Sequence, residues 1–371
     1  MVFGFKSLSL QEPCNINKTL STKDSSLELQ FQSKERENQF VGNTKEVLDK
    51  WEKMGSDSHD QIPAIAFTIN SREVDRGTDE WYHLCKMVRE ACENYGCFEI
   101  VYDKIPPQLR AETFFVSRQL FSLPLEKKKK NLNPKPYQGY LAPTVQAPLY
   151  ESFGLEEASN YESLRCLTEE ISPNGHDQFC TVISMMKQLD ELKDMINLMI
   201  LDSYGLGEKS NSTLQSKTLL RIMKYLAPPS KDYTQALRAH TDKGLGTILC
   251  DDQVSGLEVE TKDGQWVKLS LSPRSFVFLV ADSLMAWSNG RMHSVKHRVM
   301  MRGEKERYSL GAFAVPLEGS IIKAQKELVD EEHPQILKDF DYTDFSKFFA
   351  SEKGRAIDPE KQVFAYAGIS T

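Results

Sequence analysis

The chain has 371 residues, of which 40% are hydrophobic and 27% charged, with a formal net charge of -7 and a pI near 5.7. This length and composition allow one large domain or two ordinary ones with a sizeable core. The acidic charge, without a basic patch interleaved with aromatic residues, gives no electrostatic footprint for nucleic acid. The sequence therefore favours chemistry on a small-molecule partner.

Nothing in the sequence directs the chain into a membrane. No stretch approaches the roughly 20 apolar residues that span a bilayer, and the N-terminus lacks the apolar core of a signal peptide. We therefore expect a cytoplasmic protein that acts as a monomer, although residues 1–34, rich in Ser, Lys and Gln, leave an organelle transit peptide open. Seven cysteines without a CxxC pair favour free thiols over a disulfide framework or a thiolate zinc site.

The first part of the chain is predicted to be mainly helical. Residues 1–60 are polar and predict a weakly ordered arm, and residues 61–212 predict helices with short strands. Apolar residues recur at helical spacing between Thr78, a candidate N-cap, and Gly96, a candidate stop. Further elements are then expected in this order: a strand over 97–102, a helix from Pro106 to Phe121, a solvated lysine run over 127–130, and a long helix within 174–204.

Strand-like patterns dominate residues 213–320. Short β-prone segments separated by Gly, Pro, Asp and Asn suggest a sandwich or barrel, with a hairpin at Asp263-Gly264. These segments are Thr218–Leu226, Thr247–Cys250, Gly256–Glu260, Gln265–Leu269, Ser275–Ala281, Ser294–Met300 and Tyr308–Val315. The last region, 321–371, is predicted to return to helix over 322–355 and to pack aromatic residues on a sheet. The fold class is therefore mostly β with flanking helices.

Two histidines and one aspartate form a candidate metal site. His240 and Asp242 lie two residues apart, so on an extended backbone they point to the same face and can hold one ion. His297, far downstream in a strand-like run, supplies a second imidazole. Such a set occupies one face of an octahedron and leaves three positions open, which suits Fe(II) that must bind a chelating co-substrate and O₂. His293 could compete for this role, but it follows the Asn289-Gly290 turn, so we choose His297.

Arg307 and Ser309 form a candidate carboxylate anchor. They lie at i and i+2 on a predicted strand, so a guanidinium fork and a hydroxyl can converge on one carboxylate. They also follow His297 by ten and twelve residues on the same β region. The ordered set of HxD, distal His and RxS indicates a metal site with a carboxylate-binding co-substrate far more specifically than any one of its parts.

With these motifs in place, the chain resembles the plant 2-oxoglutarate- and Fe(II)-dependent dioxygenases over about residues 62–355. Tyr95–Phe98 and Trp287–Arg291 support the resemblance, and Lys135–Tyr140 and Pro148–Ser152 point to the branch of glucosinolate alkenyl- and hydroxyalkyl-producing enzymes. The resemblance implies a distorted double-stranded β-helix, or jelly roll, wrapped by helices. It also implies that a small specialised metabolite is oxidised while 2-oxoglutarate and O₂ yield succinate and CO₂, with ascorbate as an aid to activity.

The same resemblance assigns roles to individual residues. His240, Asp242 and His297 would be the iron ligands, with no catalytic side chain beyond the metal centre. Arg307 and Ser309 would hold the distal carboxylate of 2-oxoglutarate, and Tyr225 would add a hydroxyl. One departure stands out, because relatives commonly carry Asn two residues before that tyrosine, where this chain has Met223.

Aromatic residues supply the candidate substrate pocket. Small-molecule sites are mostly apolar with a few polar contacts. We expect the pocket to be lined by Tyr137, Tyr140, Tyr150, Trp287 and Phe313, although aromatic residues fill cores as well as pockets. Two other classes remain as alternatives: a catalytically silent β-sandwich that binds a ligand or partner, and a zinc hydrolase built on the same triad. Neither gives Arg307 and Ser309 a role.

Overall fold

The computed structural model describes residues 62–67, 75–133, 135–164, 179–207 and 211–369. The predicted arm at 1–60, with its candidate transit peptide, lies outside the described residues. In the described part of the chain, no helix combines the length and the apolar character that crossing a membrane requires.

The N-terminal elements follow the predicted order. Strand β1 (Ala64–Phe67) precedes helix α2 (Asp79–Asn94), whose first turn is capped because the Thr78 side chain accepts a hydrogen bond from the Trp81 N–H. Gly96, at φ 70°, ends this segment before strand β2 (Cys97–Tyr102), as predicted. Helix α3 (Pro107–Ser122) begins with proline in its first turn, where the missing N–H costs nothing. A short helix, α4 (Leu125–Lys128), follows.

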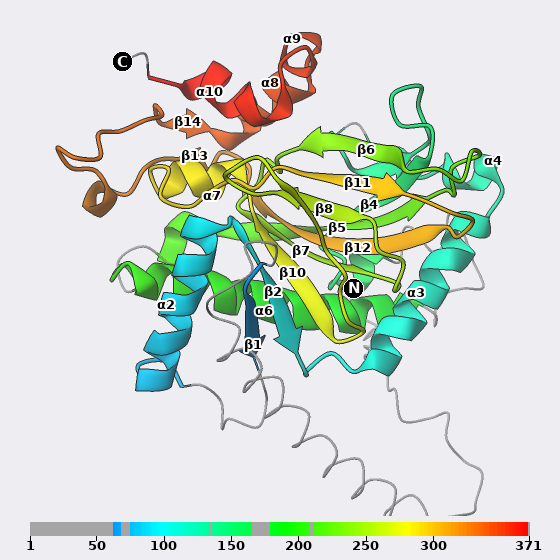
Figure 1. Ribbon diagram of the computed structural model, residues 1–371, viewed down its shortest axis with the longest axis horizontal. Coiled ribbons are helices and arrows are strands. Elements are labelled where there is room, and N and C mark those ends of the chain that lie inside the picture. Colours follow the sequence, from blue (N-terminus) through cyan, green and yellow to red (C-terminus); the bar gives the residue numbers. More distant parts are fainter. Residues whose placement is uncertain (1–61, 68–74, 134, 165–178, 208–210, 370–371) are drawn as a thin grey trace, which may run out of the picture. The chain divides into compact units, whose positions relative to one another are not determined.

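Two sheets carry the site. The larger one has the strand order β1-β2-β10-β7-β12-β5-β4-β3, and the smaller one has the order β6-β11-β8-β9. Their further strands are β3 (Gly139–Leu141), β4 (Tyr150–Glu156), β5 (Ser216–Tyr225), β6 (Thr234–His240), β7 (Gly246–Asp251), β8 (Leu257–Glu260), β9 (Trp266–Lys268), β10 (Ser275–Val280), β11 (His297–Met301) and β12 (Arg307–Pro316). The two sheets face each other as in a jelly roll, which confirms the predicted fold class (Figure 1).

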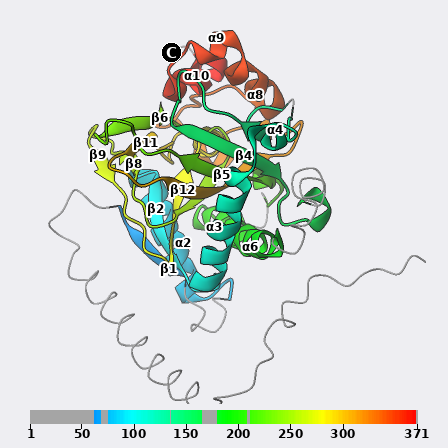
Figure 2. The ribbon, with the colours of Figure 1, turned by 90° about the vertical axis from the view of Figure 1, so that its right-hand side faces the viewer.

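Helices cover the outer face of the larger sheet. The long helix α6 (Phe179–Ser203) contacts α2 and α3, and apolar residues of all three helices share one core with that sheet. Figure 2 shows α3 and α6 together on this side. A second core lies between the sheets and includes Met223, Tyr225, Leu249 and Val299. Side chains that point inward from β5, β7 and β11 are therefore enclosed, which is the setting that a site needs.

The C-terminal region differs from its prediction. The structure has the short pair β13 (Ile321–Ile322) and β14 (Phe340–Asp341), then helices α8 (Tyr342–Ala350), α9 (Glu352–Arg355) and α10 (Gln362–Ala367). Pro334 disfavours helix at the residue before it, and the Asn289 amide donates to the carbonyls of Leu328 and His333. The aromatic spacing correctly predicted α8, but the expected helix over 322–355 was too long.

The structure also differs from the sequence prediction at several short strands, at the lysine run and at one cysteine. Strands β1, β3 and β4 were not predicted, because they are short or lack clear alternation, and β6 was expected only as the extended backbone at His240. Lys128 in the lysine run is buried, and its ammonium lies 2.8 Å from the Glu151 carboxylate instead of in solvent. Cys85, Cys92, Cys97 and Cys250 are free and buried, whereas Cys180 is disulfide-bonded, against the expectation of free thiols throughout.

Candidate active site

The two sheets bring the three candidate metal ligands together. His297, the first residue of β11, pairs across the sheet with His240, the last residue of β6, and the two rings are 4.3 Å apart between centroids. Each histidine Nε2 lies 3.8 Å from Asp242 Oδ1. The HxD spacing suggested that Asp242 lies on the same strand as His240. Asp242 lies instead just beyond the end of β6, where its backbone carbonyl accepts a hydrogen bond from the Asp282 N–H at 2.9 Å.

Hydrogen bonds orient all three side chains. The Nδ1 atoms of His240 and His297 lie 2.8 and 3.2 Å from the carbonyls of Arg238 and Val295, which leaves both Nε2 atoms directed at the centre of the cluster. The Thr247 hydroxyl donates to Asp242 Oδ2 at 2.5 Å. Such outer contacts fix the ring orientation and tautomer of metal-binding histidines and hold ligating carboxylates.

The charge state of the cluster suits a cation. Burial, and then the proximity of His297, lower the pKa of His240, so its imidazole is neutral at neutral pH. Burial alone would raise the pKa of Asp242, but His297, His240 and the Thr247 hydroxyl outweigh it and lower that pKa. A neutral imidazole and an ionised carboxylate are the forms that bind metals.

This donor set fits a mononuclear Fe(II) ion. One ligand atom from each of His240, Asp242 and His297 lies within 4.8 Å of the others, and no fourth His, Cys, Asp or Glu joins this group in the described part of the chain. Two imidazoles and one carboxylate with open positions are typical of non-haem Fe(II) oxygenases, whereas structural zinc sites are closed by four ligands. His293 is not in the cluster; it lies against Gly96, and its N–H donates to the Cys92 carbonyl at 3.0 Å.

The candidate co-substrate anchor lies in the same enclosure. The β-sheet register places Arg307 opposite Tyr225 and Ser309 opposite Met223. Arg307, Ser309 and Tyr225 are 3%, 2% and 1% exposed, and the guanidinium lies 5.2 Å from the Tyr225 ring centroid. Met223, which replaces the expected Asn, has its sulfur 3.6 Å from the Tyr225 hydroxyl, which donates to it.

Asp251 is a site residue that sequence reasoning missed. Its Oδ2 accepts from Arg307 Nη2 at 3.0 Å, while Arg307 Nε donates to the Val254 carbonyl at 2.9 Å. A buried guanidinium without such partners would be costly. Asp251 therefore compensates the arginine and fixes its direction. Thr247 was missed for a similar reason, since an ordinary strand residue carries no motif.

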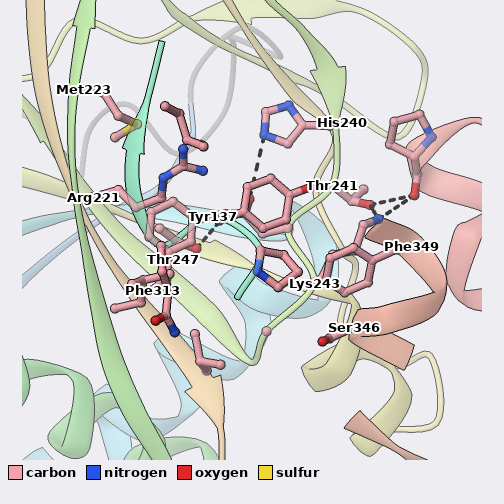
Figure 3. A pocket seen from close by; sticks show the side chains of 18 of the residues that line it. Tyr137, Arg221, Met223, His240, Thr241, Lys243, Thr247, Phe313, Ser346 and Phe349 are labelled. Carbon is pink, nitrogen blue, oxygen red and sulfur yellow. Dashed lines mark hydrogen bonds and ion pairs between the residues drawn. The ribbon is translucent and has the colours of Figure 1, made fainter. Parts of the chain in front are cut away.

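A cavity of about 670 Å³ connects these groups. The triad and the Arg307 anchor line it, together with Tyr137, Tyr150 and Phe313 of the expected substrate pocket. Figure 3 shows Arg221, Met223 and Tyr137 on one side of the view, with Thr241 and Phe349 on the other. Helix α8 contributes Tyr342 and Phe349 to the lining, so the C-terminal region forms part of the wall.

The structure places the two remaining pocket candidates in the core instead. The Tyr140 hydroxyl donates to buried Glu151 at 2.7 Å, and its ring packs on Phe153. Trp287 is 2% exposed, and its indole N–H donates to Thr213 at 3.0 Å. Both aromatic residues have a polar partner away from the cavity, which a sequence pattern does not reveal.

Comparison with known proteins points to the same family of enzymes. The model of the 2OG-Fe(II) oxygenase superfamily matches residues 217–316, and the model of the N-terminal region of non-haem dioxygenase in morphine synthesis matches residues 62–172. A probable 2-oxoglutarate-dependent dioxygenase of Arabidopsis thaliana, AOP1.2, is 41% identical over 82% of this chain and 96% of its own. The 2-oxoglutarate-dependent dioxygenase AOP3 of the same plant is 29% identical over 85% and 99%.

Two solved dioxygenase structures are similar to this chain in both sequence and fold. The rice dioxygenase for auxin oxidation is 30% identical, with a TM-score of 0.71 over 83% of this chain and 100% of that one. The 2-oxoglutarate complex of dioxygenase for auxin oxidation 1 from Arabidopsis thaliana is 28% identical, with a TM-score of 0.66 over 74% and 100%.

The facing sheets and the two-histidine, one-carboxylate cluster between them define the class of non-haem oxygenases. With these matches, the chain belongs to the plant 2-oxoglutarate- and Fe(II)-dependent dioxygenases, in the branch of the AOP relatives. It is an oxidoreductase that uses Fe(II), 2-oxoglutarate and O₂ on a small molecule. The alternatives of a silent β-sandwich and a zinc hydrolase find no support.

Proposed function

We propose that the chain oxidises a small specialised metabolite, by hydroxylation, desaturation, demethylation or ring closure, at a carbon held beside the His240, Asp242 and His297 cluster. The observation that carries this proposal is the cavity that the triad and the Arg307 anchor both line. Bound Fe(II) supplies the oxidising chemistry as 2-oxoglutarate and O₂ become succinate and CO₂. A cytoplasmic monomer without nucleic-acid or membrane partners remains our expectation for its cellular form.

In this proposal the protein's own groups bind and orient. His240 presents a neutral imidazole, His297 presents its Nε2 to the cluster, and Asp242 presents a carboxylate held by Thr247. Arg307, aligned by Asp251, and Ser309 receive the distal carboxylate of 2-oxoglutarate, with the Tyr225 hydroxyl nearby. The fork of a guanidinium can make two parallel bonds to a carboxylate, which an ammonium cannot reproduce.

The remaining cavity wall is suited to enclose substrate. Phe313 and Tyr150 contribute aromatic surface from β12 and β4, and Tyr137 and Phe349 lie with their ring centroids 6.1 Å apart. Enclosure by these groups would keep bulk water from the oxidised carbon. The names of the two structural relatives refer to auxin oxidation, which supports a small aromatic or apolar metabolite as the class to test first.

An untargeted metabolite screen tests this proposal. The full-length protein is supplied with Fe(II), 2-oxoglutarate and O₂, and succinate release is read with and without each candidate. We expect a subset of small metabolites to raise succinate release above the substrate-free level, and Asp242→Ala to abolish both. Succinate release that persists in Asp242→Ala would contradict the assignment of the triad.

A further inference from the structure

Arg221 faces the cavity from β5, the strand that also carries Tyr225, but at a different position from Tyr225 and from the co-substrate anchor on the neighbouring β12. Arg221, Met223 and Tyr225 alternate along one face of β5, and all three line the cavity. The register pairs Tyr225 with Arg307 and Arg221 with Gly311. Four residues of strand span about 13 Å. The guanidinium of Arg221 is therefore separate from the proposed site of 2-oxoglutarate.

The groups that hold Arg221 are neutral. Its Nη2 donates to the Tyr150 hydroxyl at 2.8 Å and to the Ser152 hydroxyl at 2.7 Å, both on β4. Its Cζ lies 5.2 Å from the ring centroid of Tyr137 and 5.8 Å from that of Tyr150. Its Nε is buried without a hydrogen-bond partner, and no carboxylate in the described part of the chain lies within ion-pair distance. The side chain is thus fixed in place while its charge is left uncompensated by these residues.

Other basic side chains that line the cavity differ from Arg221. Arg307, Lys243 and Lys217 each have a carboxylate partner, in Asp251, Asp282 and Glu156. Arg238 and Arg355 are exposed, so water solvates their charges. Arg221 is half-buried and has neither kind of compensation among the described residues. Burying a charge is costly unless it is paired, and a bound anion would supply the missing partner.

The backbone around Tyr137 is shaped to bring its ring over Arg221. Tyr137 has a φ of 63°, in the left-handed region that non-glycine residues rarely adopt. A Cβ at Gly154, which pairs with Arg221 across the sheet, would lie 2.1 Å from the Tyr137 carbonyl oxygen. Glycine at this position therefore permits the close approach. Strained residues of this kind cluster at ligand-binding sites.

We propose that Arg221 binds the carboxylate of the substrate, so that the oxidised molecule is a small organic acid. The carboxylate would accept from the guanidinium between the Tyr137 and Tyr150 rings, and the apolar remainder would extend past Phe313 toward the metal cluster. This inference rests on the proposed function. It deepens that function by naming the chemical group that the substrate carries.

Direct binding of simple acids tests the proposal while the substrate itself is unidentified. The full-length protein, loaded with Fe(II) and saturating 2-oxoglutarate under nitrogen, is titrated calorimetrically with phenylacetate, hydrocinnamate and octanoate and with their primary amides. We expect at least one acid to bind about tenfold or more tightly than its amide, because a charge-assisted bond is lost in the amide. Arg221→Gln should remove this preference, and Arg221→Lys should retain part of it.

Arg302→Gln is the matched control, because Arg302 is an exposed arginine outside the cavity lining and its loss changes the net charge equally. It should keep the preference for the acid. Equal binding of every acid and its amide, no binding of any acid, or an unchanged preference in Arg221→Gln would overturn the proposal. Iron content and substrate-free succinate release are measured on the same samples. A wild-type protein that holds no iron and releases no succinate would contradict the proposed function instead of this inference.

Discussion

The two ends of the cavity are built in different ways. At the proposed co-substrate end, Arg307 and Ser309 are on one long strand, nearly inaccessible to solvent, and Arg307 is held by the buried carboxylate of Asp251. At the proposed substrate end, Tyr137 lies on a turn and is 46% exposed, and α8 contributes Phe349 from a separate part of the chain.

This difference has a physical consequence. A buried guanidinium between paired strands can recognise one fixed chemical group, because its partners and its direction are set by the sheet. Loops and terminal helices tolerate sequence change more readily than the strands that support them. One end of the cavity therefore suits a co-substrate of fixed structure, and the other end could adapt to different substrates through sequence change.

The largest effect is expected at the metal cluster. His297→Ala removes one of three donors, so Fe(II) affinity should fall by more than about a hundredfold, since loss of an orienting contact alone costs roughly 10- to 100-fold. Succinate release should fall to background. His293→Ala is the control, because His293 lies outside the cluster. Iron content after gel filtration checks this, and retention of iron by His297→Ala together with its loss from His293→Ala would reverse the assignment.

The next effect is expected at the co-substrate anchor. Arg307→Lys keeps the charge but loses the fork, which should weaken 2-oxoglutarate by about 1.5 to 3 kcal/mol, or roughly tenfold to a hundredfold. Iron should remain bound. Half-saturation of succinate release by 2-oxoglutarate measures this, with Arg302→Lys in an exposed loop as the control. An unchanged half-saturation would remove Arg307 from the anchor.

A smaller effect is expected for a residue that orients a ligand. Thr247→Val preserves shape but removes the hydroxyl that donates to Asp242 at 2.5 Å. Fe(II) affinity should fall by about tenfold. Thr113→Val is the matched control, because Thr113 is also buried but its hydroxyl donates to the Leu109 carbonyl within α3. If both variants bind Fe(II) equally, the Thr247 hydroxyl does not orient Asp242.

The sequence correctly predicted that His240, Asp242 and His297 cluster, and it also placed Arg307 and Ser309 on one strand face, because both patterns depend on spacing along strands. Arg307 and Ser309 share a face through the two-residue period of a strand. The Asp251 and Thr247 contacts could not be predicted, since they join positions that only tertiary packing brings together. Tyr140 and Trp287 show the same limit, because an aromatic residue in a core and one in a pocket look alike until its hydrogen-bond partner is known.

The smallest change in stability is expected at the substrate end. Tyr137→Ala should alter the free energy of unfolding by no more than about 1 kcal/mol, because the side chain is 46% exposed and lies on a turn. It should nevertheless reduce substrate-dependent succinate release while sparing the substrate-free rate, and Phe313→Ala should shift the same ratio. Tyr140→Phe should instead leave the ratio of the two rates unchanged. It should lower the free energy of unfolding by about 1 to 3 kcal/mol, because the Glu151 carboxylate loses the hydrogen bond from the Tyr140 hydroxyl. Urea unfolding and paired rate measurements check this. An equal loss of both rates in Tyr137→Ala would assign Tyr137 to the fold.

The most direct test of the central claim is a titration of succinate release against bound Fe(II) in the full-length protein. We predict that the rate rises in proportion to iron and levels off at one iron per chain, and that Zn(II) in the same site gives none. Succinate formation that does not depend on iron, or that Zn(II) restores, would contradict the assignment of His240, Asp242 and His297 as the centre of an iron-dependent dioxygenase.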